Sequence, residues 1–222
     1  MRALSKRSSI KRGGCDCCSV DEKTGMQALG RESSPMKLGK LERHDHEYQR
    51  YGTQCLIANL DIATGKIMSP SLGDTRTEED FLSHIKQTIA RSPTSSWILV
   101  MDQLNTHKSE SLVRFIAKAC GIEGDLGQKG KSGILKSMES RAEFLSDKNH
   151  RIRIVYTPKH ASWLNQIECW FGLLVRRLLR RLVVKSKEEM NEKILAFIDY
   201  YNKTMAKPFK WLFRGFKENS PC

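Results

Sequence analysis

The stretch Trp97-Ile98-Leu99-Val100-Met101-Asp102 decides how this chain folds. Five consecutive apolar residues are typical of a strand that is buried on both faces of a sheet, and this run ends abruptly at a carboxylate. In α/β sheets, ligands and reacting groups lie beyond the carboxyl ends of the strands. We therefore expect a covered α/β sheet with Asp102 at the edge that carries chemistry.

Segments on either side of this strand predict the rest of the sheet and its helices. The expected strands cover residues 15–22, 53–60, 67–69, 96–102 and 152–156, and the expected helices cover 77–91, 109–120, 162–184 and 187–203. Ser162 is the expected cap of the third helix, and residues 23–48 read as an extended loop. In this order, the first strands follow one another directly and helices lie between the later strands. Such an order predicts a sheet of mixed direction that is flanked by helices.

The length and composition fit one domain with a basic segment at each end. The chain has 222 residues, of which 39% are hydrophobic and 28% charged, enough to bury a core. We expect a basic disordered arm over 1–14, a catalytic domain over 15–205 and an irregular tail over 206–222. Within the domain, glycines recur every three residues from Gly124 to Gly133, so residues 122–150 read as an insertion with one short helix near 134–146.

The charge distribution predicts a polyanionic partner. The formal net charge is +13, of which residues 1–14 contribute +5 and residues 151–222 contribute +9. Basic flanks around a nearly neutral body favour nucleic acid, and the alternative is a generally basic soluble protein. The sequence has no apolar run of membrane-spanning length and no secretory signal, and its seven cysteines show no regular spacing. We therefore expect a cytoplasmic, nucleoid-associated protein and no membrane partner.

A carboxylate also stands out in Ser162-Trp163-Leu164-Asn165-Gln166-Ile167-Glu168-Cys169-Trp170-Phe171. If this segment is helical, Asn165 lies one turn before Glu168 and Gly172 one turn after it, on the same face. A carboxylate, an amide and a gap without a side chain form a plausible polar pocket. The alternative is a solvated glutamate on an amphipathic helix.

Carboxylates gathered from distant parts of a chain bind hard divalent cations, which prefer oxygen ligands. Besides Asp102 and Glu168, the candidate acids are Asp21 and Asp61. Asp61 follows a more regular strand, but Ala63-Thr64-Gly65 comes directly after it and places it at a hairpin turn. We therefore prefer Asp21. For Asp102, the alternative reading is a cap of the next helix.

Other groups of potential metal ligands are weaker. His44, Asp45 and His46 have ligand-like spacing, but solvated loop residues are the simpler interpretation. Cys15 and Cys18 form a C-x-x-C pair that lacks a second pair of ligands, so ordinary thiols are favoured over a zinc site.

Four motifs together resemble the catalytic domain of DDE transposases, in the insertion-sequence-630 group related to the mariner elements. They read VDEKTGMQAL (20–29), YQRYGTQCLIANLDIATGKI (48–67), VMDQLNTHKS (100–109) and YTPKHASWLNQIECWF (156–171). Trp-Leu-Asn-x-x-Glu-x-x-Phe is highly specific, and the similarity runs from about residue 19 to 212. It implies a ribonuclease H-like fold whose mixed sheet has five strands.

The resemblance also implies a function and its residues. Asp21, Asp102 and Glu168 would be the catalytic acids and metal ligands, and Asn105, His107 and Asn165 would support them. The implied cofactor is a pair of Mg²⁺ ions, for which Mn²⁺ can substitute, and the implied reactions are DNA strand cleavage and strand transfer. The implied partners are double-stranded DNA, comprising transposon ends and target, and a second copy of the chain in a homodimer.

A basic stripe adjoins this candidate site. On a continuous helix, Arg176, Arg177, Arg180 and Arg181 would share one face with Glu168 nearby, where they could grip DNA phosphates. Lys159 and His160 would add to the same surface. The alternative is a solvated charged face.

Two features depart from the family pattern. Asp102 and Glu168 are separated by 66 positions (168 − 102), about twice the usual spacing, and residues 122–150 account for the excess. About twenty residues precede Asp21, where relatives carry helix-turn-helix domains, so we expect a truncated or split copy whose recognition domain is a separate fragment. Two rival functions remain: a ribonuclease H-like nuclease without strand transfer, and a non-catalytic DNA-binding remnant.

Overall fold

A computed structural model describes residues 14–31, 48–159 and 161–208. The expectations for the arm over 1–14, for His44, Asp45 and His46, and for His160 fall outside these residues, apart from Gly14 at the edge of the arm. So does most of the tail over 206–222. Within the described part, no helix is both long enough and apolar enough to cross a membrane.

Five strands form one mixed sheet in the order β3-β2-β1-β4-β5. They are β1 (Cys15–Arg31), β2 (Tyr48–Asp61), β3 (Ile67–Gly73), β4 (Ser96–Met101) and β5 (Ile152–Tyr156). β2 runs antiparallel to both β1 and β3, whereas β4 runs parallel to β1 and to β5. The predicted α/β sheet of mixed direction is therefore confirmed, and its central strand is β1.

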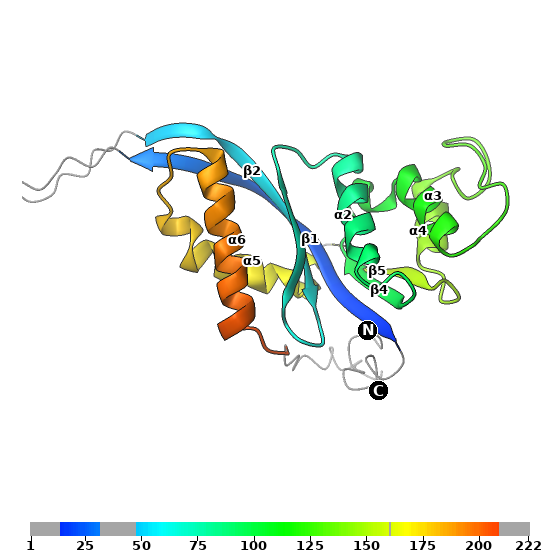
Figure 1. The fold of residues 1–222 in the computed structure, drawn as a ribbon. Coiled ribbons are helices and arrows are strands. Elements are labelled where there is room, and N and C mark those ends of the chain that lie inside the picture. Colours follow the sequence, from blue (N-terminus) through cyan, green and yellow to red (C-terminus); the bar gives the residue numbers. More distant parts are fainter. Residues whose placement is uncertain (1–13, 32–47, 160, 209–222) are drawn as a thin grey trace, which may run out of the picture.

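Helices cover both faces of this sheet (Figure 1). They are α2 (Glu78–Ala90), α3 (Glu110–Ala119), α4 (Met138–Leu145), α5 (Ile167–Arg177) and α6 (Lys187–Thr204). The described residues also form three short 3-10 helices: η2 (Asn105–Lys108), η3 (Ser162–Leu164) and η4 (Leu179–Arg181). Thr77 caps α2 and Ser109 caps α3, as polar residues that accept from backbone N–H groups should.

The two largest hydrophobic cores lie on opposite faces because side chains alternate along a strand. On β2, Ile57 packs in the core beneath α2, α3 and α4, whereas its neighbours Leu56 and Ala58 pack beneath α5 and α6. The insertion belongs to the first core, since its Leu135 and Leu145 are fully buried there. Residues 122–150 are therefore integrated into the domain rather than lying over it as a separate lid.

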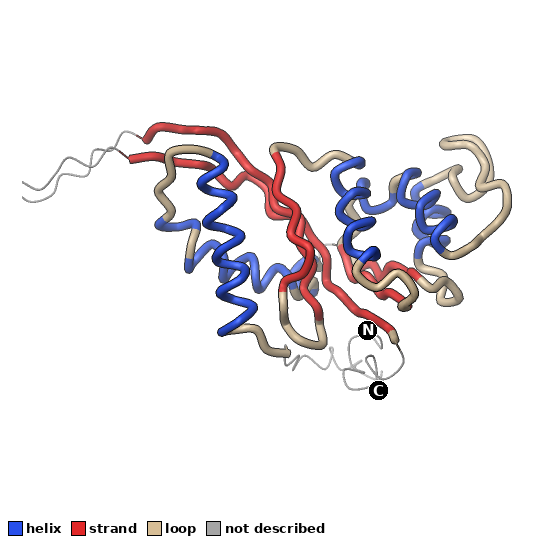
Figure 2. The backbone as a smooth tube through the Cα atoms, in the orientation of Figure 1, coloured by secondary structure: helices blue, strands red, loops and turns tan. Residues whose placement is uncertain are grey.

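The predicted loop over 23–48 is wrong in its first part. β1 continues to Arg31 and pairs with a β2 that already begins at Tyr48, forming a long ribbon over which α6 packs (Figures 1 and 2). The register shifts between Lys23 and Met26, where Gly25 adopts a positive φ of 68°. Such a bulge breaks the alternation of buried and exposed residues, which hides the strand from a search for period two.

The predicted long helix over 162–184 is also wrong. The chain forms η3, then an extended Asn165, then α5, which ends at Arg177 and is followed by η4. Leu178, Leu179 and Leu182 all turn towards the core beneath α5 and α6, and the Val184 N–H donates to the Leu29 carbonyl. Burying these residues and docking on β1 outweigh the continuation of one regular helix.

Candidate active site

The sheet places Asp21 on β1 and Asp102 directly after the end of β4, which runs parallel to β1. Ser19 of β1 pairs with Val100 of β4, so the two aspartates follow that pair at the same distance along each strand. Glu168 enters from the first turn of α5 on the other side of β1 and is exposed. Asp102 and Glu168 lie close enough to Asp21 for their charges to act on it, so three carboxylates that are far apart in the sequence lie in one region of the fold.

Asp21 is the most buried of these acids, with 7% of its surface exposed. Its Oδ1 accepts from the Glu22 N–H at 2.8 Å and its Oδ2 accepts from Asn165 Nδ2 at 3.0 Å. Burial raises the pKa of Asp21 to about 6, and the negative charges of Asp102 and Glu168 add to that rise. Burial is therefore the main reason that the charged form of Asp21 is disfavoured.

Asn165 connects the segment before α5 to the central strand. Its Nδ2 also donates to the Val20 carbonyl at 2.9 Å, and its Oδ1 accepts from the Ser19 hydroxyl. Ser19 Oγ in turn accepts from the Ile167 N–H at 2.9 Å. Asn165 is fully buried and precedes α5, so the prediction that it shares a helical face with Glu168 is wrong. Instead it holds Asp21 directly.

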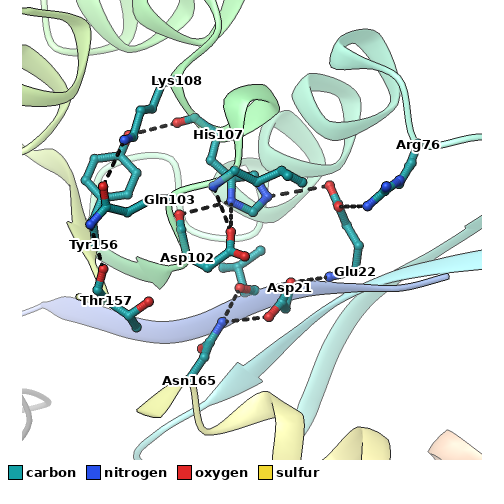
Figure 3. Close-up of polar contacts among 12 residues, drawn as sticks. Asp21, Glu22, Arg76, Asp102, Gln103, His107, Lys108, Tyr156, Thr157 and Asn165 are labelled. Carbon is teal, nitrogen blue, oxygen red and sulfur yellow. Dashed lines mark hydrogen bonds and ion pairs between the residues drawn. The ribbon is translucent and has the colours of Figure 1, made fainter. Parts of the chain in front are cut away.

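His107 lies between Asp102 and a fourth acid, Glu22 (Figure 3). Its Nδ1 is 2.8 Å from Asp102 Oδ1, and its Nε2 is 3.5 Å from Glu22 Oε1. Burial alone would lower the pKa of His107, but the contacts with the two carboxylates outweigh burial and raise it to about 9. The contact with His107 in turn lowers the pKa of Asp102. The pair keeps Asp102 ionised.

Glu22 is the residue that the sequence prediction missed. It follows Asp21 in β1, so its side chain points to the opposite face of the strand, towards α2 and η2. Only 2% of that side chain is exposed. The sequence did hold one signal for Glu22. It directly follows a candidate catalytic acid, and its side chain belongs to a face of the strand that packs beneath a helix.

The loop after β4 is tied to the end of β5 (Figure 3). Gln103 Nε2 donates to the Thr157 carbonyl at 3.0 Å, and Lys108 Nζ donates to Gln103 Oε1 at 3.1 Å. The Tyr156 hydroxyl donates to the His107 carbonyl at 2.8 Å, and the Lys108 ammonium lies 5.1 Å from the centre of the Tyr156 ring. These contacts fix the loop that carries Asp102.

A cavity of about 720 Å³ opens beside Asp102. One wall is the loop after β4, including exposed Asn105, and another is the chain after β5, including Lys159. The third wall is α4 of the insertion. The lining residues are Asp102, Gln103, Leu104, Asn105, Lys108, Met138, Glu139, Ala142, Thr157, Pro158, Lys159 and Ser162. Its size lies within the range of about 300–1,000 Å³ that is typical of ligand sites.

The four arginines do not share one helical stripe, because α5 ends at Arg177. Arg176 and Arg177 lie in its last turn, whereas Arg180 and Arg181 belong to η4. All four side chains are exposed. The basic surface therefore exists, but the continuous helix that was expected to carry it does not.

Asp61, the alternative first acid, lies at the hairpin between β2 and β3. Its Oδ1 accepts from the Ala63 N–H at 2.9 Å, and its carbonyl accepts from the Gly65 N–H at 2.7 Å. Its carboxylate stabilises the turn, whereas that of Asp21 belongs to the acidic edge.

The donor set at this edge suits a divalent cation. Asp21, Asp102 and Glu168 offer only oxygen ligands, and mutual repulsion contributes to the raised pKa of Asp21. Across residues 14–31, 48–159 and 161–208, however, no three His, Cys, Asp or Glu side chains are already arranged around a common metal position. The three carboxylates therefore suit a divalent cation chemically, but they must move closer together to bind one.

The sequence matches the family model described as DDE superfamily endonuclease over residues 16–191. No curated protein matches it. Among solved structures, the Mos1 mariner paired-end complex with Mn aligns with a TM-score of 0.51 and 12% identity, covering 86% of this chain and 49% of that chain. This likeness confirms the expected ribonuclease H-like fold.

Two further matches have lower TM-scores of 0.48. They are the Mos1 transposase paired-end complex with left transposon end, at 10% identity over 93% of this chain and 53% of that chain, and a pre-cleavage Mos1 transpososome, at 10% identity over 89% and 52%. The chain thus spans about half the length of the structures that it matches.

Proposed function

The chain belongs to the DDE superfamily endonuclease family, and on that basis we propose that it is a transposase catalytic domain that cleaves DNA strands at transposon ends and joins them to a target. One observation supports this proposal above the others. Asp21 lies two residues beyond Ser19 in β1, and Asp102 lies two residues beyond Val100, the β4 partner of Ser19; Asn165 anchors the first acid and His107 the second. Each of these two acids is thus held in place by a neighbouring side chain.

Asp21, Asp102 and Glu168 would hold two Mg²⁺ ions, for which Mn²⁺ would substitute. Such ions, when bound, lower the pKa of an attacking water or 3′-hydroxyl and stabilise the charge on the leaving oxygen. The chain's own contribution is to keep the ligands ionised and oriented. His107 does both for Asp102, and the amide of Asn165 orients Asp21.

The proposed substrate is double-stranded DNA, comprising transposon ends and target. Exposed Arg176, Arg177, Arg180 and Arg181 would contact its phosphates, and Lys159 would do so beside the cavity. Joining two ends to one target requires two active sites, so we propose a homodimer as the working form.

A plasmid-nicking assay with Mg²⁺ or Mn²⁺ tests the cleavage step. The wild-type chain should convert supercoiled DNA to nicked circles, Asp102→Asn should not, and Asp199→Asn, at an exposed site on α6, should behave as wild type. Equal activity of the wild type and Asp102→Asn would refute the proposal. Joining a pre-cut transposon end to a target plasmid tests strand transfer separately from cleavage.

A further inference from the structure

We propose that Glu22 is a positioning residue for the metal site: it holds the His107 ring so that Nδ1 stays on Asp102. Its consequence for catalysis rests on the proposed function, whereas the contacts themselves do not. Glu22 and His107 lie on different elements, β1 and η2, and both side chains are almost completely buried.

The two facing atoms have no better partner. His107 Nε2 and Glu22 Oε1 lie 3.5 Å apart, and neither makes a hydrogen bond within the described part of the chain. Burying polar atoms in this way costs free energy unless they compensate each other. Arg76 anchors Glu22 from outside, with its Nη1 3.7 Å from Glu22 Oε2.

On its Nε2 side, the His107 ring has its polar contact with Glu22. On its Nδ1 side, the ring also lies 3.2 Å from the Asp102 carbonyl oxygen. The Phe81 ring covers it, with centroids 4.3 Å apart and planes tilted by 34°. A half-turn of the imidazole about its own bond would place carbon atoms against both carboxylates. Glu22 opposes that half-turn, because both ion-pair contacts would be lost together.

The ring orientation matters because it gives the two oxygens of Asp102 different roles. Oδ1 lies 2.8 Å from His107 Nδ1 and accepts a hydrogen bond from the Leu104 N–H at 3.0 Å. No contact to Oδ2 exists among the residues described, and 31% of the side chain is exposed. Oδ2 is therefore the oxygen presented to a cation. Without Glu22, the ring and then the carboxylate lose this fixed direction.

Mn²⁺ affinity, followed by electron paramagnetic resonance of the free ion, tests the inference without turnover. Glu22→Met should weaken binding about tenfold or more, as expected for an outer-shell partner. Glu22→Gln, which keeps an oxygen for Nε2, should recover most of that loss. Gln54→Met replaces another buried polar side chain in the adjacent strand β2 and should leave the affinity unchanged.

A double-mutant cycle then asks whether Glu22 acts through Asp102. In the Asp102→Asn background, Glu22→Met should cause no further loss of Mn²⁺ affinity, because the oriented ligand is already gone. Additive losses, or an equal loss in Gln54→Met, would show a general structural effect and overturn the inference.

A metal-free measurement keeps the inference testable if Mn²⁺ binding is weak. In protein labelled with ¹⁵N-histidine, the His107 Nδ1–H should be protected from exchange in the wild type and in Glu22→Gln, and exchange freely in Glu22→Met. Equal protection in wild type and Glu22→Met would refute the inference. If Glu22→Met does not fold, Arg76→Met, which removes the outer anchor, should give a smaller change in the same direction.

The two proposals fail differently. Wild-type protein whose Mn²⁺ affinity depends on Glu22 but that does not nick DNA would refute the proposed function alone. Wild-type protein that nicks DNA, with Glu22→Met binding Mn²⁺ as tightly as wild type, would refute the positioning role alone.

Discussion

Asn165 donates a hydrogen bond to the Asp21 carboxylate over 3.0 Å, although 144 positions separate the two residues in the chain. The same amide nitrogen reaches the Val20 carbonyl. The segment before α5 is thus fastened to the central strand at the residue that carries the first acid. The docking of this segment on β1 and the orientation of the Asp21 carboxylate therefore depend on the same amide.

Replacing Asn165 by leucine should therefore affect both stability and chemistry. Groups on Ser19, Val20 and Asp21 would remain buried without a partner, at a cost of about 2–3 kcal/mol in the free energy of unfolding. Nicking of plasmid DNA should fall at least about tenfold, because Asp21 loses its orientation.

Asn202→Leu is the matched control for that substitution. Asn202 of α6 also bridges a helix to a strand, through two hydrogen bonds of 2.8 Å with the backbone of Ile67. It should lower stability, by about 1–2 kcal/mol, but leave nicking intact below the unfolding transition. Equal loss of nicking in both variants would mean that Asn165 acts only through the fold.

Asp21→Asn should stabilise the metal-free protein at pH 8 while abolishing nicking. The pKa of Asp21 is raised to about 6, so the folded state binds the proton more tightly than the unfolded state. Wild-type stability therefore falls as the pH rises through about 6. The asparagine removes this loss, so we expect a gain of about 1–2 kcal/mol at pH 8.

Urea unfolding in the presence of a chelator measures this effect. The advantage of the asparagine should shrink at pH 4, where the wild-type carboxyl is protonated. If the difference between the two proteins is the same at pH 4 and pH 8, the carboxylate of Asp21 is not destabilised by its surroundings.

Stability should also depend on His107 at higher pH. Its pKa is raised from about 6.5 to about 9, so its contribution is fully present below pH 6.5 and is lost as the pH rises through about 9. We expect a wild-type decrease of about 2–3 kcal/mol across this range that is absent from His107→Gln. His84, whose pKa burial lowers to about 3, stays neutral throughout, so His84→Gln should keep the wild-type slope.

Filling the cavity beside Asp102 should block the substrate. Ala142 lines this cavity from α4, so Ala142→Trp should reduce nicking about tenfold or more, since the ring occupies space that DNA needs. Ala90→Trp adds the same ring at an exposed position at the end of α2 and should have no effect. Full activity of Ala142→Trp would show that DNA does not enter against the insertion.

The basic end of α5 should contribute to DNA affinity in a salt-dependent way. Each phosphate contact adds about 0.9 to the slope of log affinity against log salt, so Arg176→Gln with Arg177→Gln should lower it by up to about 2. Arg114→Gln removes an arginine that is already paired with Glu110 and should leave the slope unchanged. An unaltered slope in the double variant would place the DNA elsewhere.

The sequence was informative where one local pattern determined the outcome. The apolar run before Asp102 predicted a buried strand that ends at an acid, and α2 and α3 followed from the spacing of their apolar residues. These features depend on neighbours in the chain. The tip of the β1–β2 ribbon could not be predicted in this way. Its pairing joins residues that are distant in the sequence, and its bulge at Gly25 disturbs the alternation of buried and exposed residues.

The site residues divide in the same way. Asp102 and His107 are five positions apart, and their pairing follows from a short loop. Asn165 and Glu22 owe their roles to contacts across the fold, with Asp21 and His107 respectively. No periodicity in the sequence reports such contacts, since a buried polar residue is recognised only once its partner is known.

The burial of Asp21 has a consequence for how this gene changes over time. A carboxylate that is buried near other negative charges lowers the stability of the folded protein. Mutations that neutralise it would be favoured by folding alone, and only a requirement for chemistry opposes them. Under the proposed function, a lineage that no longer moves DNA should therefore lose the acid at position 21 early.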